Sequence, residues 1–250
     1  MSESTTKPES DFATTKESVY NAQPSPSTIP VLARFEDRPN EWDFSPWVNR
    51  LEALLTFSNT PFELETKFGN PITTPRGRLP IVKLQSPVTK KQETIPDSLF
   101  AYRELVKRGL ANDLDTGLSA DEMAKSRAIQ SLLEEIYLLL LSEGWIDHFK
   151  IARDKLFLRT LPYPIRMIVG YLFYRKMCLR RELAGLKNRP ASEIDFLRNS
   201  GMDAIATWVG EGKKHILGGE TPTEADAIVF AYLATIYANP EYVYVIMNAL

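Results

Sequence analysis

Residues 76–98 of the chain read RGRLPIVKLQSPVTKKQETIPDS, and this stretch decides how the neighbouring segments fold. β-prone apolar side chains occupy most of 81–84, directly after a proline, and a polar run separates them from 93–95, which Pro96 ends. Two short runs of this kind, joined by polar residues, predict a β-hairpin. Because proline donates no amide hydrogen, it suits the start of the first strand and the end of the second.

The flanking segments supply the other elements of a small sheet. Residues 29–35 predict a strand, Ser45-Pro46 opens a helix that continues to about 57, and 62–68 alternates like a second strand. Proline suits the first helical turn, with Ser45 at the N-cap, because an amide there would have no partner. After the hairpin, 97–106 predicts another helix. This order of strand, helix, strand, loop, strand, strand and helix is that of a thioredoxin-like domain with a four-stranded mixed sheet.

The remainder of the chain predicts helices only. A charged connector at 109–118 separates it from the sheet, so we expect a thioredoxin-like domain at 29–108 and an all-helical domain at 119–250. The predicted fold class is therefore α/β plus all-α. Further helices are expected over 147–159, 164–186 and 192–216. Helix starts with reciprocal caps are predicted at Ser119 with Glu122, Ser192 with Asp195, and Thr223 with Asp226.

Composition limits the range of functions. Residues 1–28 are rich in Ser, Thr, Pro, Glu and Lys, and predict a disordered tail. A formal charge of -2 over 250 residues disfavours nucleic acid and anionic membrane surfaces as general partners. No apolar run reaches the ~20 residues of a membrane span, and the N-terminus lacks the apolar core of a signal peptide. We therefore expect a cytoplasmic protein.

The sequence lacks the motifs that several other kinds of catalytic or cofactor site require. The single cysteine, Cys178, lies in an apolar and basic helical pattern that predicts a packing thiol rather than a nucleophile. His148 and His215 are isolated, and the sequence has no HExxH, paired-cysteine, Gly-rich phosphate or Ser/His/Asp motif. Metal and nucleotide cofactors are therefore not implied.

Four motifs, in their order along the chain, resemble the glutathione transferase superfamily. They are Ser45-Pro46 at a helix start, Leu79-Pro80 before the third strand, Asp97-Ser98 after the fourth, and Gly-Gly-x-x-Pro-Thr-x-x-Asp-Ala late in the helical half. The resemblance covers about 30–237. Within the superfamily, the segments SPWVNRLEALL and LPYPIRMIVGYLFYRKM look most like the failed-axon-connections and metaxin-like branch.

The resemblance implies glutathione as co-substrate and Ser45 as the catalytic residue. Only the thiolate of glutathione is a useful nucleophile, and a hydroxyl at a helix N-terminus can donate to that sulfur, where the helix dipole also favours negative charge. The alternative is that Ser45 serves only as an N-cap. Leu79, before a cis Pro80, would offer its backbone to the cysteinyl part of glutathione, or the turn serves the fold alone.

Three further residues complete the implied site. Ser98 would hold the γ-glutamyl carboxylate at a helix N-terminus, and Asp97 would accept from the γ-glutamyl ammonium or, in a homodimer, assist across the interface. The alternative is a plain helix cap. Arg78, with Arg76, would hold the glycyl carboxylate unless both arginines are merely solvated.

One departure from the family matters for this site. Members of the branch often carry Cys where Val48 stands and Lys where Asn49 stands, so a thiol-based chemistry has no residue here. Aromatic and basic side chains leave two alternatives open. Trp42, Phe44 and Trp47 either wall an electrophile pocket or belong to the core. The basic face of the 164–186 helix is expected to be solvated.

Two functions remain open. The resemblance implies a transferase that conjugates glutathione to a small hydrophobic electrophile, or uses glutathione in an elimination or isomerisation. The alternative is a glutathione-transferase-fold binding or scaffold protein without turnover. A third, metaxin-like role in mitochondrial import would call for a C-terminal anchor, which the final residues VIMNAL do not suggest.

Overall fold

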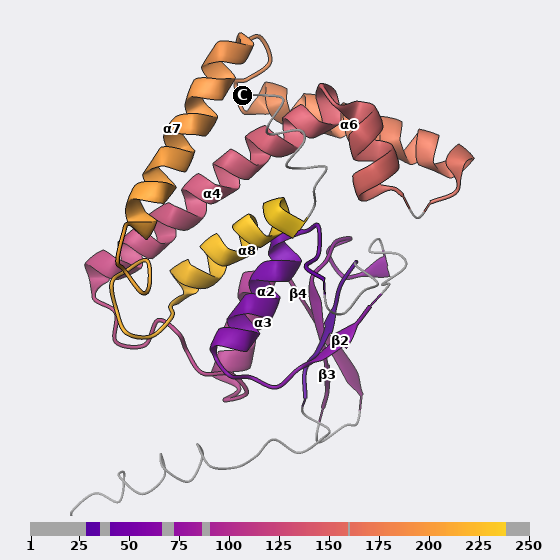
Figure 1. Cartoon of the computed structure of the whole chain (residues 1–250). Coiled ribbons are helices and arrows are strands. Elements are labelled where there is room, and N and C mark those ends of the chain that lie inside the picture. The colour runs from indigo at the N-terminus through magenta and orange to yellow at the C-terminus, as the bar shows by residue number, and fades with distance from the viewer. Residues whose placement is uncertain (1–28, 36–40, 67–72, 87–90, 160, 239–250) are drawn as a thin grey trace, which may run out of the picture.

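The structure is a computed structural model, and it describes residues 29–35, 41–66, 73–86, 91–159 and 161–238 (Figure 1). The tail predicted at 1–28 lies outside these residues. Within them, a small sheet with two helices is followed by a set of helices only. The fold class predicted from the sequence, a thioredoxin-like domain with a helical C-terminal domain, is confirmed. The exact domain boundaries stay a prediction.

The hairpin predicted over 76–98 forms the antiparallel half of a four-stranded mixed sheet. Its strands pair from Ile81 opposite Pro96 to Gln85 opposite Gln92. The strand order is β2-β1-β3-β4, with β1 parallel to β2 and antiparallel to β3. The strands are β1 (Val31–Ala33), β2 (Glu63–Glu65), β3 (Ile81–Gln85) and β4 (Gln92–Pro96).

Helices α2 (Pro46–Phe57) and α3 (Ser98–Lys107) pack against this sheet on the side that faces the C-terminal helix (Figure 1). Leu51 and Leu54 of α2 share one buried cluster with Leu105 of α3 and with apolar residues of β1 and β3. Burying leucines of this kind contributes about 1.5–3 kcal/mol for each side chain. The helices therefore hold the sheet in place through a common core.

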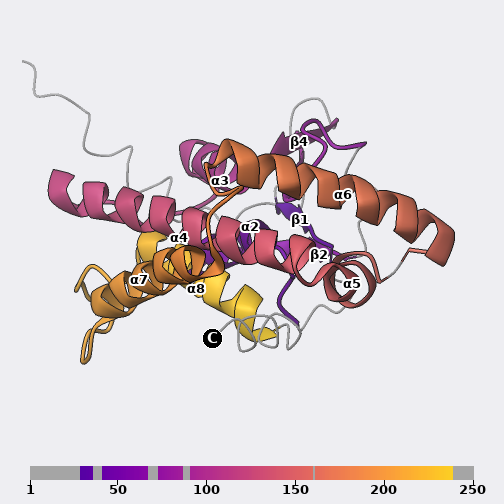
Figure 2. The same cartoon turned by 90° about the horizontal axis from the view of Figure 1, so that it is seen from above.

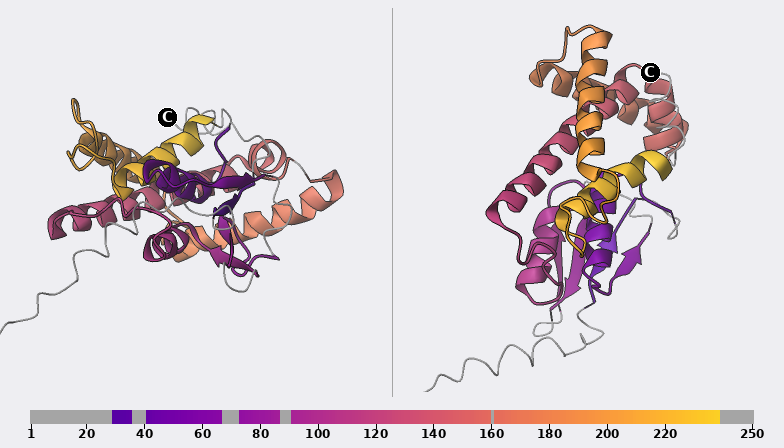
Figure 3. Two further views of the ribbon diagram at one scale, coloured as in Figure 1. Left: turned by 90° about the horizontal axis from the view of Figure 1, so that it is seen from below. Right: turned by 60° about the vertical axis from the view of Figure 1, so that its left-hand side comes forward.

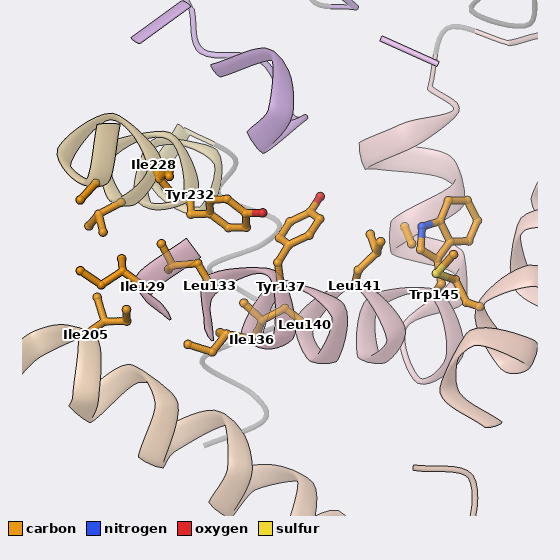
Figure 4. Packing of buried hydrophobic residues seen from close by; sticks show 14 of the residues in the cluster. Ile129, Leu133, Ile136, Tyr137, Leu140, Leu141, Trp145, Ile205, Ile228 and Tyr232 are labelled. Carbon is orange, nitrogen blue, oxygen red and sulfur yellow. The ribbon is translucent and has the colours of Figure 1, made fainter. Parts of the chain in front are cut away.

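The helical part is built around one long central helix, α4. Its apolar face carries Ile129, Leu133, Ile136 and Leu140, which meet side chains from α7 and α8 (Figure 4). Figure 3 shows α8 lying between this part and α2, which α8 also contacts. The helical elements are α4 (Ala120–Ile146), α5 (Phe149–Ile151), the π-helix η3 (Ala152–Phe157), α6 (Tyr163–Leu183), α7 (Ala191–Val209) and α8 (Glu224–Ala238).

Of the three predicted reciprocal caps, the one at Ser119 is complete, and at Thr223 only the half in which the Asp226 side chain accepts is formed. The Ser119 hydroxyl accepts from the Glu122 amide, and the Glu122 carboxylate accepts from the Ser119 amide at 2.8 Å, so this capping box is complete. At the start of α8, the Asp226 carboxylate accepts from the amide and the hydroxyl of Thr223, at 2.8 and 2.7 Å, and from the Ile216 amide at 2.8 Å. Asp226 therefore ties the helix start to the preceding loop.

The cap predicted at Ser192 is wrong. Helix α7 begins at Ala191, with Pro190 at the N-cap and no capping side chain, so Ser192 falls inside the first turn. Asp195 instead pairs with the buried Arg198 at 2.7 Å, because a buried guanidinium needs an anionic partner. The helix also ends earlier than predicted, at Val209, because Gly210 adopts a left-handed φ of 58°.

Candidate functional site

Ser45 stands at the N-cap of α2, as predicted, but its side chain does not cap the helix. Its backbone carbonyl accepts from the amides of Val48 and Asn49, both at 3.1 Å, while the hydroxyl makes no capping hydrogen bond. Within the part of the chain that the structure describes, no other residue bonds the hydroxyl either. The residue is 6% exposed. The Ser45 hydroxyl thus stands at a helix N-terminus and has no hydrogen-bond partner among the described residues.

A buried polar network holds Ser45 in this position. The Asp43 carboxylate accepts from the Ser45 amide at 2.9 Å and from the Phe35 amide at 2.8 Å. The Asn49 side chain bonds the backbone of Asp43 twice, at 2.8 and 2.7 Å, and donates to the Thr235 hydroxyl of α8 at 2.8 Å. Asn49 thus connects the Ser45 loop to the C-terminal helix.

Sequence reasoning missed this network. An Asp two residues before Ser45 is the spacing of an Asx turn, so the Asp43 contact could have been found. The contact from Asn49 to Thr235 had no local signal, because the two residues lie 186 positions apart. Arg34, fully buried, pairs with Glu52 at 3.3 Å and lies 3.9 Å from Asp43. Burial raises the pKa of Glu52, and the Arg34 charge opposes that rise.

The peptide bond between Leu79 and Pro80 is cis, as predicted. The Pro80 carbonyl accepts from the Asp97 amide at 3.1 Å, so the turn is joined to the start of α3. Leu79 itself packs in a small cluster with Val48, one turn after Ser45. No hydrogen bond engages the Leu79 amide or carbonyl among the residues described.

Asp97, not Ser98, is the N-cap of α3. Its carboxylate accepts from the amides of Leu99 and Phe100 at 3.0 and 3.4 Å, and its φ of 83° is a strained value for a residue with a side chain. Its other oxygen lies 3.3 Å from Arg76. Ser98 is the first residue of the helix and is 3% exposed. Its hydroxyl has no partner in the described part.

The two arginines predicted for the glycyl carboxylate are placed differently. Arg76 is engaged, because it pairs with Asp97 and stacks over Phe100, with its guanidinium carbon 5.4 Å from the ring centroid. The Arg78 backbone is fixed by the Thr74 hydroxyl at 2.9 and 3.0 Å. Burial, then the charges of Arg180 and Arg78, lowers the pKa of Lys176 on α6. Arg78 of the 73–80 turn and Arg180 of α6 are therefore both near enough to Lys176 for their positive charges to act on it.

The aromatic side chains near Ser45 pack against other elements. Trp47 meets Tyr137 of α4 edge-on at 5.3 Å, and Trp42 meets Phe230 of α8 at 4.9 Å. Phe44 stacks on Phe35, with the two ring centroids 5.1 Å apart. These contacts support the core interpretation over that of a pocket wall.

One surface hollow lies away from the Ser45 loop. It lies between the start of α4 and the end of α7 and is lined by Trp208, Lys125 and Lys213. Among the described residues, no group of His, Cys, Asp and Glu side chains is arranged to hold a metal ion. In the same ranges, none of the helices has the length and apolar character that crossing a membrane requires.

Comparison with known proteins defines the class. The model for the glutathione S-transferase N-terminal domain matches residues 46–149. The fold is similar to a glutathione S-transferase of Ceriporiopsis subvermispora, crystallised in complex with glutathione (TM-score 0.53, 15% identity, 87% of this chain and 92% of that one). It is also similar to a glutathione transferase of Phanerochaete chrysosporium (TM-score 0.50, 18% identity, 84% and 85% covered). The chain is therefore similar to the glutathione S-transferase superfamily in its fold and in the sequence of residues 46–149.

Among curated proteins, the chain is similar to metaxin-1. It is 27% identical to mouse metaxin-1 and 29% identical to human metaxin-1 over 193 residues, which is 73% of this chain. The match spans 58% of the mouse protein and 40% of the human one, so the chain covers less than two thirds of these relatives.

Proposed function

We propose that the thioredoxin-like part of this chain binds glutathione, and that Ser45 activates the bound thiol toward a small hydrophobic electrophile. The observation that carries the proposal is the Ser45 hydroxyl, which stands at the N-terminus of α2 and has no hydrogen-bond partner among the residues that the structure describes. A serine that served only as a helix cap would bond the first-turn amides with its side chain. The Ser45 carbonyl accepts from the Val48 and Asn49 amides, as an N-cap carbonyl ordinarily does, but the Ser45 side chain makes no capping bond.

The chemistry would run through the glutathione sulfur. Loss of the thiol proton to solvent gives the thiolate, and the Ser45 hydroxyl would donate to that sulfur at the positive end of α2. The sulfur then forms a bond to the electrophilic carbon, and the electron pair of the broken bond leaves with the displaced group. In an addition, the pair goes to the neighbouring atom, which takes a proton from water.

The remaining contacts would hold the peptide rather than react. The backbone of Leu79 suits the cysteinyl amide and carbonyl, and the Ser98 hydroxyl at the start of α3 suits the γ-glutamyl carboxylate. Asp97 is less free than the sequence predicted, because it caps α3 and pairs with Arg76. An Asp97 contact to the γ-glutamyl ammonium would use its outer oxygen in place of Arg76. Arg78 is proposed for the glycyl carboxylate. A cytoplasmic location and a homodimer also remain proposals.

The second candidate is a binding or scaffold protein without turnover, and one observation favours it. Val48 and Asn49, at the positions of the branch's Cys and Lys, are both fully buried, and Asn49 is committed to Asp43 and Thr235. The Val48 and Asn49 side chains in the first turn of α2 therefore serve the packing of the protein.

The test separates the two serines. Ser45→Ala should lower the turnover rate and raise the pKa of the bound thiol while sparing affinity, because the hydroxyl meets the sulfur mainly when charge develops. Ser98→Ala should weaken glutathione binding, since the γ-glutamyl group is held alike in ground and transition states. A hydrogen bond to a charged group contributes roughly 1.5–3 kcal/mol, so each effect should be about ten- to a hundredfold.

Calorimetric titration with glutathione, thiolate absorbance and thiol consumption with a panel of electrophiles give the three readouts. Ser119→Ala is the matched control, because it removes an N-cap serine that does cap its helix, far from the site. It should lower thermal stability and leave binding unchanged, whereas Ser45→Ala should not lower stability. If the wild-type chain neither binds glutathione at millimolar concentration nor consumes it, the transferase proposal is wrong and the scaffold candidate replaces it.

A further inference from the structure

Helix α6 presents an exposed stripe of apolar side chains on one face, with Arg175 and Lys176 between its two halves. The helix has 21 residues, about 32 Å at 1.5 Å per residue, and it runs beside α4 along the edge of the helical part (Figure 2). Only Gly170 and Met177 of α6 are buried, and both face the neighbouring elements. The opposite face carries Ile165, Ile168, Leu172, Leu179 and Leu183.

These five side chains lie on one face because their spacings of three, four, seven and four follow the helical period. They are 51%, 66%, 60%, 55% and 79% exposed, in chain order. An ordinary surface helix places polar residues opposite its buried stripe, whereas α6 places leucine and isoleucine there. A contiguous exposed apolar patch of this kind marks an interaction surface.

Cations flank the stripe on both sides. Arg175 lies on one side, and Lys176 and Arg180 lie on the other, all exposed. Two other arginines of the helix point back to the protein, where Arg166 pairs with Asp154 and Arg181 pairs with Asp147. In the described part of the chain, Arg175 and Arg180 have no carboxylate partner. The single acidic residue of the helix, Glu182, is bound to Lys187 at 2.7 Å.

We propose that this face of α6 docks on an anionic phospholipid surface, with the stripe lying in the interface and the flanking cations on the lipid phosphates. An apolar stripe bordered by Lys and Arg is the pattern of helices that lie in the plane of a membrane. The overall charge of -2 does not oppose this, because the cations are concentrated at the surface that would meet the lipid.

The same charges disfavour a second copy of the chain as occupant. A two-fold axis through the middle of the stripe would set Arg175 and Lys176 directly against their own counterparts. Like charges brought together at the centre of an interface oppose association. A bilayer with anionic headgroups instead supplies the opposite charge along the whole helix.

The test is co-sedimentation of the full chain with vesicles. Wild-type protein should bind vesicles that mix phosphatidylcholine with phosphatidylserine, bind pure phosphatidylcholine vesicles less, and be released by salt. The double variant Ile168→Asp/Leu172→Asp should lose at least about a hundredfold in affinity, since each buried side chain contributes about tenfold or more. Arg175→Gln/Arg180→Gln should lose about 25-fold on the anionic vesicles, because each surface cation contributes about fivefold.

Met123→Asp is the matched control, because Met123 is 42% exposed at the other end of α4 and its loss should leave vesicle binding unchanged. Circular dichroism and thermal melts verify that each variant folds. The proposal is overturned if wild-type chain stays in the supernatant with anionic vesicles, or if the stripe variant binds them equally well. It is also overturned if the stripe variant turns a wild-type dimer into a monomer while neither protein binds lipid.

Discussion

Glu224, the first residue of α8, should make the protein less stable as the pH rises through neutrality. Its side chain is 5% exposed, and burial, followed by the negative charge of Asp115, raises its pKa to about 7. Arg103, with a nitrogen 2.8 Å from the carboxylate, and Arg50 act against this rise. The backbone amide of Glu224 donates to Asp115 at 2.9 Å, which keeps the two acids together.

The size of the effect follows from linkage. Below about pH 4.5, the carboxyl is protonated in both the folded and the unfolded chain, so its ionisation contributes nothing. Between about 4.5 and 7 the folded chain holds a proton that the unfolded chain has lost, so the free energy of unfolding falls with rising pH. At about 1.4 kcal/mol per pH unit, the loss reaches about 3 kcal/mol above pH 7.

Urea denaturation of the wild type and of Glu224→Gln between pH 4.5 and 8.5 measures this cost. The variant mimics the protonated acid, so the two proteins should have similar stability at acid pH, and the variant should be the more stable one above neutrality. Glu220→Gln, at a side chain that is 93% exposed in the preceding loop, should track the wild type throughout. If the wild type instead gains stability over Glu224→Gln as the pH rises, the Arg103 ion pair outweighs burial and the reasoning is wrong.

Three further changes should alter the free energy of unfolding measured in urea. Asp226→Ala removes three hydrogen bonds at the start of α8 and should cost about 2–3 kcal/mol; an unchanged melt would mean that the cap does not form. Asn49→Ala should cost about 2–4 kcal/mol, and a double-mutant cycle with Thr235→Ala should give a coupling of about 1 kcal/mol, so strict additivity would contradict the contact. Gly201→Ala should destabilise the protein by about 1 kcal/mol or more, because an added Cβ would lie 2.9 Å from a packed isoleucine side chain. The control Gly144→Ala adds a Cβ that meets nothing within 4 Å, so it should stabilise the protein by up to about 1 kcal/mol. Equal effects of the two substitutions would refute the packing argument.

Close neighbours along the chain made much of the fold predictable. The hairpin and the capping box at Ser119 each depend on residues a few positions apart, so local chemistry determines them, whereas the cis bond before Pro80 was predicted from the resemblance to the glutathione transferase superfamily. The same reasoning failed at Ser192, where the local signal for a cap was present. There Pro190 takes the N-cap position, and Asp195 pairs with Arg198 three residues further on. Arg198 is buried against Glu143 of α4, so part of the reason lies in tertiary packing.

In the candidate site, too, some features follow from the local sequence and others from tertiary packing. The sequence by itself determined that Ser45, Leu79 and Ser98 would stand at two helix starts and a proline turn, because each position follows from its immediate neighbours. Only the tertiary structure decided that the Ser45 hydroxyl makes no hydrogen bond within the described ranges, that Asn49 reaches Thr235, and that the stripe on α6 faces solvent. These outcomes depend on which distant segments cover a side chain, and burial of that kind is a property of the packed molecule rather than of any local stretch.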